Sequence, residues 1–130
     1  MNTIKISKSK EGNTVDLSFV DISINEIIGH LKYDINKEDK TALIHDTFLF
    51  PEYRRKGILG SYIDNILCDI NCEGAKIAEL YAKSEDTRET WKRLGFVELN
   101  GGKMRKIGTN CDCNIKSSFN CRLNMIAIEN

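Results

Sequence analysis

The chain has no long apolar run, no excess of either charge and only one proline among its 130 residues. A helix that crosses a membrane needs about 20 consecutive apolar residues, so we expect no contact with a membrane. Nineteen basic residues balance nineteen acidic ones, whereas a general nucleic-acid binder normally carries a basic excess. We therefore expect no nucleic acid among the partners. The length favours a single domain with a modest hydrophobic core.

The N-terminus, MNTIKISKSK, contains lysines but lacks the apolar segment of a secretory signal. The sequence therefore predicts a cytoplasmic protein in which the five cysteines are reduced thiols. Cys68 and Cys72 are four residues apart, and Cys111, Cys113 and Cys121 lie in the last part of the chain. Structural zinc normally takes four ligands from paired motifs, which three cysteines without a nearby histidine do not supply. We expect no metal site.

The first half of the sequence alternates apolar and polar residues at period two, which is typical of strands. The predicted strands are Thr3–Ser7, Thr14–Ile24, Glu26–Ile35 and Thr41–Phe50. The polar segments KSKEGN and NKEDK are predicted to be turns. Residues expected to face the core include Val15, Leu17, Phe19, Ile22 and Ile24.

After Gly57 the period changes, and apolar residues recur along one face of a helix from Ile58 to Ile70. Gly74 is predicted to end this helix. The remaining predicted elements are a strand over Ala75–Ala82, a helix over Glu85–Leu94, and a hairpin of Phe96–Asn100 with Lys103–Ile107. A strand, a crossover helix and a strand form a right-handed parallel unit. We predict one domain over residues 1–109 and a C-terminal extension over residues 110–130, either an edge strand or a loose tail.

The stretch FPEYRRKGILGSY, residues 50–62, places basic residues between a predicted strand and a predicted helix. The first turn of a helix has backbone N–H groups without partners and carries the positive end of the helix dipole. Gly57 would let a ligand approach the backbone closely. The stretch therefore favours a phosphate or pyrophosphate group, and a solvated surface turn is the alternative. The basic residues are Arg54, Arg55 and Lys56.

The segment PEYRRKGILGSYI resembles the acetyl-CoA signature of the GNAT superfamily, the acyl-CoA-dependent N-acyltransferases. That signature is Arg or Gln, two further residues, Gly, one further residue, and Gly or Ala. Arg54 and Gly57 occupy its first two defined positions. Leu59 stands where glycine or alanine is usual, and Gly60 follows it.

A second block, ETWKRLGFVEL, resembles the family's later motif, in which an asparagine, an alanine and a tyrosine lead into Leu-Gly-Phe. The residues Leu94, Gly95 and Phe96 match that ending. Ser84 stands at the asparagine position, Thr87 at the alanine position and Trp91 at the tyrosine position. The two blocks follow the family's order and spacing, and the resemblance covers residues 26–107.

The resemblance implies a three-layer α+β fold, with a mixed and mostly antiparallel twisted sheet, a central parallel strand–helix–strand unit and splayed middle strands. The pantetheine arm of acetyl-CoA would lie between the strands over residues 43–50 and 75–82, bonded to backbone near Leu49. The pyrophosphate would bind the backbone amides of residues 55–60. The implied cofactor-binding residues are Leu49, Arg54, Arg55, Lys56, Gly57, Ile58, Leu59, Gly60, Ser61, Ser84 and Trp91.

In the family an amine attacks the thioester directly, so a base must take the ammonium proton and an acid must protonate the thiolate. The usual acid is the tyrosine that Trp91 replaces, and an indole N–H does not ionise usefully. The candidate base is His45, on the fourth strand, because histidine can accept a proton near neutral pH. Asp46 would lie on the opposite face unless a bulge intervenes, and Tyr81 is a candidate hydroxyl. A structural role is the alternative for each.

The resemblance implies an N-acetyltransferase that moves an acetyl group from acetyl-CoA to a primary amine of a small molecule, a peptide or a protein. Only Ser7–Asn13 separates the first strand from the next, where the family has a helical segment that shapes the acceptor site. We therefore expect an open acceptor cleft. The alternative function is a weak or inactive module that binds CoA or a protein partner. A homodimer is one assembly that the sequence allows.

Overall fold

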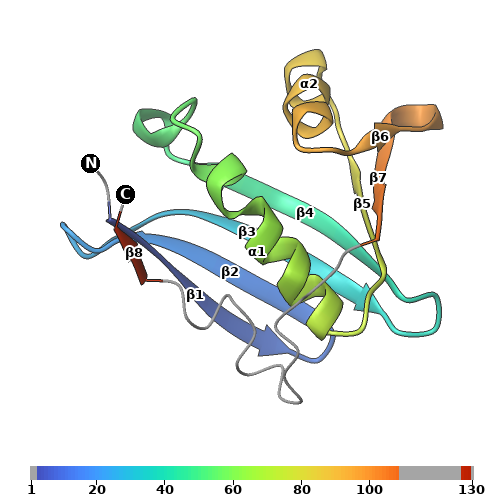
Figure 1. The fold of residues 1–130 in the computed structure, drawn as a ribbon, viewed down its shortest axis with the longest axis horizontal. Coiled ribbons are helices and arrows are strands. Elements are labelled where there is room, and N and C mark those ends of the chain that lie inside the picture. Colours follow the sequence, from blue (N-terminus) through green and yellow to red (C-terminus); the bar gives the residue numbers. More distant parts are fainter. Residues whose placement is uncertain (1–2, 109–126, 130) are drawn as a thin grey trace.

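A single mixed sheet organises the chain, with α-helices against it (Figure 1). The computed structural model describes residues 3–108 and 127–129. The eight strands run in the order β6-β7-β5-β4-β3-β2-β1-β8. Their bounds are β1 (Thr3–Glu11), β2 (Thr14–Asp21), β3 (Glu26–Asn36), β4 (Thr41–Leu49), β5 (Ile77–Tyr81), β6 (Val97–Glu98), β7 (Lys103–Ile107) and β8 (Ala127–Glu129). The helices are α1 (Ile58–Cys72) and α2 (Glu85–Arg93), and the short 3-10 turns are η1 (Pro51–Tyr53) and η2 (Asn100–Gly102).

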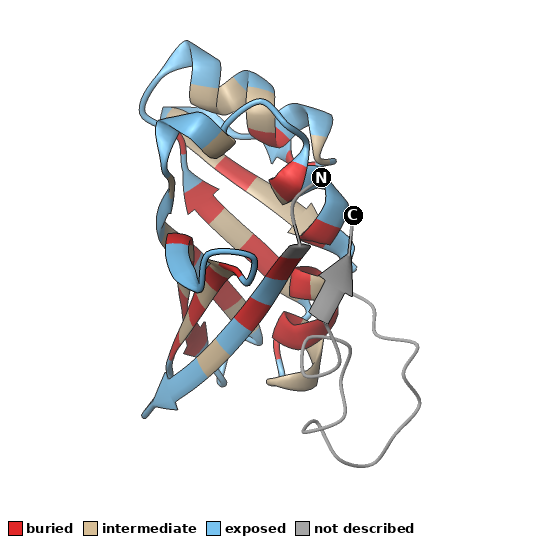
Figure 2. Ribbon diagram, turned by 90° about the vertical axis from the view of Figure 1, so that its left-hand side faces the viewer, coloured by how far each residue is buried: buried red, intermediate tan, exposed pale blue. Residues whose placement is uncertain are grey.

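Strands β1 to β4 form consecutive antiparallel pairs, as predicted from their alternating pattern. Buried and exposed residues alternate along them (Figure 2). The prediction that the first strand ends at Ser7 is wrong, because β1 continues to Glu11. Lys8 and Lys10 belong to the strand because they pair with Leu17 and Val15 of β2. Their ammonium groups pair with carboxylates at the C-terminal end of α1, so these polar residues are held in the sheet.

The turn between β2 and β3 holds two isoleucines that were expected to be buried. Ile22 is 43% exposed and Ile24 is 54% exposed, so this expectation is wrong. The strand ends at Asp21, and the chain then turns through Asn25, whose φ is 57°. The period-two alternation continues past the end of the strand in the sequence, whereas the backbone has already left the sheet.

Helix α1 lies across the sheet where the apolar stripe predicted it (Figure 1). Its buried side chains join those of the strands in one hydrophobic core. Near the C-terminal end of α1, the fully buried Asp69 accepts hydrogen bonds from Tyr33 Oη at 2.7 Å and from Lys8 Nζ at 2.8 Å. Lys8 Nζ also lies 2.6 Å from Glu73 Oε2. This network fixes α1 on β1 and β3.

Strands β4 and β5 form the parallel pair, and they diverge soon after it begins. Thr41, Ala42 and Leu43 pair with Ile77, Ala78 and Glu79, and no pair follows. Beyond Leu43, β4 pairs with β3 alone, whereas β5 pairs with β7 up to Tyr81. The α+β fold with splayed middle strands is therefore confirmed, and the split opens a path between the two halves of the sheet.

Two short strands form the edges of the sheet. Strand β8 pairs antiparallel with β1 at one edge, and the short β6 pairs with β7 at the other, around η2. Cys111, Cys113 and Cys121 lie outside the described residues, and the division of the chain at residue 109 stays a prediction. Cys68 is buried and disulfide-bonded, so the expectation of reduced thiols is wrong for this residue. Among the described residues, none of the helices has the length and apolarity to cross a membrane.

Candidate functional site

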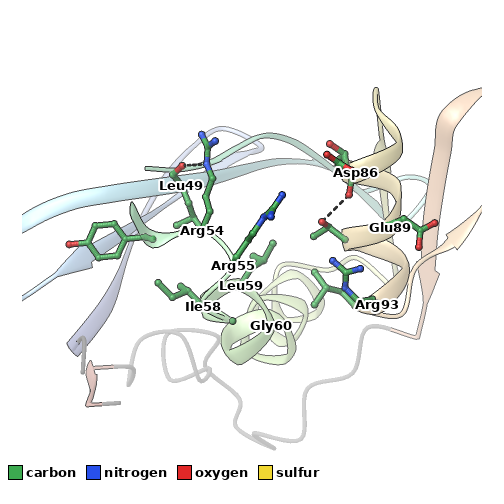
Figure 3. Close-up of a pocket in the computed structure, with 14 residues that line it drawn as sticks. Leu49, Arg54, Arg55, Ile58, Leu59, Gly60, Asp86, Glu89 and Arg93 are labelled. Carbon is green, nitrogen blue, oxygen red and sulfur yellow. Dashed lines mark hydrogen bonds between the residues drawn. The ribbon is translucent and has the colours of Figure 1, made fainter. Parts of the chain in front are cut away.

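Two adjoining cavities occupy the split in the sheet. The larger, of about 950 Å³, lies between the β4–α1 loop, the start of α1, and α2 (Figure 3). The smaller, of about 410 Å³, lies between the diverging ends of β4 and β5. Both cavities are lined by Leu49, Arg54, Leu59, Thr87 and Thr90. The shared lining makes them two parts of one cleft.

The loop from Tyr53 to the start of α1 is held in an unusual backbone conformation. Arg55 has φ 61° and Gly57 has φ 76°, both left-handed. Gly57 is the N-cap of α1, no side chain caps the helix there, and its first turn closes through Ser61 N to Gly57 O at 2.8 Å. The N–H groups of the three residues between them have no partner within the helix. These groups, on Ile58, Leu59 and Gly60, belong to residues that line the larger cavity.

The three basic residues of the loop lie in different places. Arg54 Nε donates to Leu49 O at 2.7 Å, and its guanidinium lies 5.2 Å from the centre of the Phe48 ring. Arg55 lines the larger cavity, whereas Lys56 lines neither cavity. Arg54 therefore covers a carbonyl of β4 in the cleft, and Arg55 is the basic side chain that the cavity gains from this loop.

Helix α2 contributes a second arginine, which the sequence did not point to. Arg93 lines the larger cavity, on the wall opposite Arg55 (Figure 3). Arg88 and Lys92 of the same helix pair with glutamates of α2 and β6. Within the described part of the chain, Arg55 and Arg93 have neither a hydrogen bond nor an ion pair through their side chains. Asp86 and Glu89 also line this wall, so the cavity is not uniformly positive.

The candidate bases His45 and Asp46 both line the smaller cavity. A bulge intervenes between them: the β3–β4 register shifts between His30 and Lys32, and Asp46 has φ 58°. Asp46 Oδ1 lies 3.3 Å from Nε2 of His30, which the sequence did not single out. Contact with His30 is the largest cause of the lowered pKa of Asp46. His45 Nε2 lies 3.2 Å from Asp34 Oδ2.

Tyr81 and Trp91 line the same cavity in different ways. Tyr81 is 56% exposed at the end of β5. Trp91 is buried, and its ring meets that of Phe96 edge to face at 5.1 Å. Tyr81 is therefore a phenol that a ligand in the cleft can reach, whereas Trp91 is chiefly a wall and core residue.

Three of the predicted cofactor residues do not line the cleft. Lys56 and Ser61 are absent from both cavities. Ser84 is the N-cap of α2, where its hydroxyl accepts from Thr87 N at 3.1 Å. Leu59 lines both cavities, and a Cβ on Gly60 would meet Leu94 Cδ2 at 3.7 Å, an ordinary contact. The cofactor roles of these residues stay predictions.

Comparison with solved structures finds acetyltransferases of similar fold. A spermidine N-acetyltransferase from Vibrio cholerae aligns with a TM-score of 0.62 and 18% identity over 75% of this chain and 66% of its own. The PaiA N-acetyltransferase from Thermoplasma acidophilum, solved with coenzyme A, aligns with 0.62 and 20% over 73% and 61%. A cAMP-binding acyltransferase from Mycobacterium smegmatis aligns with 0.60 and 13% over 75% and 30%.

The chain has the GNAT fold. The likeness is one of fold alone at these identities, and the chain spans less than two thirds of the length of each of these structures. No protein-family model matches the sequence, and no curated protein is similar enough to count as a relative. In this GNAT fold β1 joins β2 through a tight turn at Gly12, without a helix between them.

Proposed function

We propose that this chain is an N-acetyltransferase that transfers an acetyl group from acetyl-CoA to a primary amine. The observation that supports the proposal most is the split between β4 and β5, which opens directly onto the N-terminus of α1. An extended ligand with a thioester at one end and phosphates at the other needs these two parts in this order. The GNAT fold and the two sequence motifs agree with it.

The donor side of the cleft fits an acyl-CoA. The unpartnered N–H groups of Ile58, Leu59 and Gly60 suit a pyrophosphate, because a helix N-terminus favours negative charge. Nothing lies within 4 Å of a Cβ built on Gly57, so the backbone there is open to a ligand. Arg55 would add charge from the loop. The part of β4 from beyond Leu43 to Leu49 does not pair with β5, and its free edge would offer backbone groups to the amides of the pantetheine arm.

On the acceptor side, the chemistry needs groups that take a proton from an ammonium. Asp46 and His45 stand at the mouth of the cavity, where an amine would reach the thioester. The lowered pKa of Asp46 keeps its carboxylate ionised at neutral pH, which suits it to attracting an ammonium more than to accepting its proton. His45, an imidazole, is then the proposed base.

The leaving thiolate needs a proton or a hydrogen bond. Tyr81 is the phenol that lines the cavity within the described residues, and a phenolic O–H can donate to a thiolate. We assign it the role of acid. The indole N–H of Trp91 can donate a hydrogen bond, but it does not ionise near neutral pH and so cannot supply a proton to the thiolate.

A second candidate function is binding of CoA without transfer. The burial of Trp91 against Phe96 favours it, because the position of the usual acid is taken by a core side chain. The two functions share the donor site and differ on the acceptor side. A measurement of acetyl transfer therefore distinguishes the two functions, whereas a measurement of CoA binding does not.

We also propose a class of acceptor, a form of assembly and a cellular location. The acceptor is a primary amine of a small molecule, a peptide or a protein. The spermidine N-acetyltransferase structure from Vibrio cholerae is dodecameric, and we propose self-association here, with a homodimer as the simplest form. Light scattering would measure it. We propose the cytoplasm as the location. The Cys68 disulfide is more typical of an oxidising compartment, so the redox state of Cys68 tests the location. Alkylation of free thiols in fresh lysate would show whether Cys68 is reduced, as the cytoplasm requires.

Two measurements test the function in order. Thermal unfolding with acetyl-CoA comes first, because a ligand at a hundred times its Kd stabilises the native state by about 2.7 kcal/mol. An unchanged Tm at saturating acetyl-CoA would contradict both functions. Thiol release with a panel of amines comes second. Release that depends on an amine supports the transferase, and binding without release on any amine supports the module.

A further inference from the structure

Asp21, at the end of β2, is a buried carboxylate whose hydrogen-bond donors are neutral. It is 3% exposed. Its Oδ1 accepts from Ser23 N at 3.0 Å and from Ser23 Oγ at 2.6 Å, and its Oδ2 accepts from Tyr53 Oη at 2.8 Å. Within the described residues no cation forms an ion pair with it. A buried charge costs free energy unless hydrogen bonds satisfy it, so these three bonds hold Asp21 in one place.

Tyr53 connects this carboxylate to the cleft. It is the last residue of η1, it lines the larger cavity, and it packs against the hydrophobic core. The bond to Asp21 joins residues 32 apart in the sequence. The bond therefore connects the start of the loop, at Tyr53, to the end of β2, at Asp21. The other end of the loop continues into α1.

Apart from the bond of Arg54 Nε to Leu49 O, the shape of the loop between Tyr53 and α1 depends on its two flanks. Arg55 is left-handed, a conformation that costs a residue with a Cβ about 1 kcal/mol or more. Such a conformation persists when the flanking structure determines it. One flank is α1, whose first residue, Ile58, is buried. The other flank is the 3-10 turn η1, fixed through Tyr53.

We infer that Asp21 and Tyr53 are positioning residues for the proposed acyl-CoA site, which hold the phosphate-binding loop in its binding conformation. The inference rests on the proposed function. It adds that affinity for the CoA phosphates depends on a carboxylate of the β2–β3 turn that does not line the cleft. The lowered pKa of Asp21, caused first by Ser23 and then by Tyr53, agrees with a carboxylate that stays ionised in this role.

The chain supplies a matched control. Tyr33 Oη donates to Asp69 Oδ2 at 2.7 Å over a sequence separation of 36, almost the same bond as that of Tyr53 with Asp21. Tyr33 is buried below α1 and lines neither cavity. Tyr53→Phe and Tyr33→Phe therefore each remove a tyrosine–aspartate hydrogen bond of similar length, and only the bond of Tyr53 lies beside the loop.

The experiment measures the Kd of CoA by titration calorimetry and the Tm for the wild type and both variants. We expect Tyr53→Phe to raise the Kd roughly three- to thirtyfold. Tyr33→Phe should lower the Tm at least as much and leave the Kd unchanged. Asp21→Ala should add nothing to the Kd in a Tyr53→Phe background, because both changes break the same bond.

Two results overturn the inference while the proposed function stands: a wild-type Kd in Tyr53→Phe, or an equal loss of affinity in Tyr33→Phe. The second would mean that CoA affinity follows general stability. If the wild type itself binds no CoA, the proposed function is wrong and the inference falls with it. A wild type that binds no CoA contradicts the proposed function, whereas a wild type that binds CoA together with an unexpected Kd in a variant contradicts the inference alone.

Discussion

Nε2 of His30 on β3 lies 3.3 Å from Oδ1 of Asp46 on β4, across the bulge that gives Asp46 a φ of 58°. Left-handed backbone in a residue with a side chain is unusual, and it often marks a functional position. Here it occurs in a residue that lines the smaller cavity. The bulge thereby joins two neighbouring residues, His45 and Asp46, into one candidate acceptor site.

Asp46→Asn should lower kcat/KM for the amine about tenfold or more, equivalent to about 1.4 kcal/mol, without a change in the Kd of CoA. The pKa of Asp46 is held below its ordinary value, mainly by His30, so the carboxylate is already ionised at neutral pH. The loss should therefore be constant between about pH 6 and pH 9. Asp16→Asn, on β2 and outside both cavities, is the control. A variant as active as the wild type would exclude Asp46 from the acceptor site.

Tyr81→Phe should lower kcat about tenfold to a hundredfold and leave the Kd of CoA unchanged. The reason is that Tyr81 is the phenol that lines the smaller cavity, whereas it does not line the larger cavity, where phosphate would bind. Steady-state kinetics with the best amine, together with calorimetry, would measure both constants. Unchanged kcat would show that another group or water protonates the thiolate.

Arg93→Gln should weaken CoA binding about three- to thirtyfold and reduce its dependence on salt. Arg93 lines the larger cavity without an ion partner in the described chain, whereas Arg88, on the same helix, lies 2.7 Å from Glu85 and lines neither cavity. Arg88→Gln is therefore the matched control and should bind as the wild type does. Equal affinities of the two variants would exclude Arg93 from the site.

A comparison of CoA with 3′-dephospho-CoA extends this test. If Arg93 meets the 3′-phosphate, Arg93→Gln should weaken CoA but not dephospho-CoA. If it meets the pyrophosphate, both ligands should lose affinity alike. The wild type is measured with both ligands as the reference.

Sequence periodicity was sufficient for most of the fold. The stripe from Ile58 to Ile70 predicted α1, and the run over residues 41–50 predicted β4, because burial of one face leaves a clear period. Period could not show that Lys8 and Lys10 belong to a strand, since their partners lie on α1, more than 60 residues away.

The site was less predictable than the fold. The bulge at Asp46 has no signal in the sequence, because its φ is set by pairing with β3 rather than by a glycine. The sequence did not point to His30 or Arg93 either, because their candidate roles depend on neighbours that are brought close only by the fold. The salt-bridge pattern of α2 could have given a clue to Arg93. Arg88 and Lys92 each have a glutamate three residues earlier, Glu85 and Glu89, whereas Thr90 stands three residues before Arg93, and Glu89, four residues before it, pairs with Lys92.

Lys8→Met should destabilise the fold by about 3 kcal/mol or more, because Asp69 is fully buried and would lose its cation. Lys10→Met is the control: its pair with Glu73 is partly solvated, so the expected cost is below about 1 kcal/mol. Urea unfolding would measure both. Equal costs would show that Tyr33 and the protein dipoles suffice to hold Asp69.

The same network predicts how stability depends on pH. Burial lowers the pKa of Lys8, but hydrogen bonds to Asp69 and Glu73 outweigh it, so the net pKa lies above the ordinary 10.5. Its contribution is present below that value and is lost as pH rises through the raised pKa. Burial raises the pKa of Glu73, but Lys10 and Lys8 bring it below 4.5, so its contribution is lost on acidification. Tm should therefore be flat between these limits and fall on both sides. A fall in Tm near neutral pH would contradict this assignment.

The most direct test of the proposed CoA site is a titration of the ¹⁵N-labelled protein with CoA, followed amide by amide. We expect saturable shifts of the amides of Ile58, Leu59 and Gly60 and of the part of β4 from beyond Leu43 to Leu49, which does not pair with β5. Saturable binding that leaves these amides unmoved, or no shifts at any CoA concentration, would contradict it.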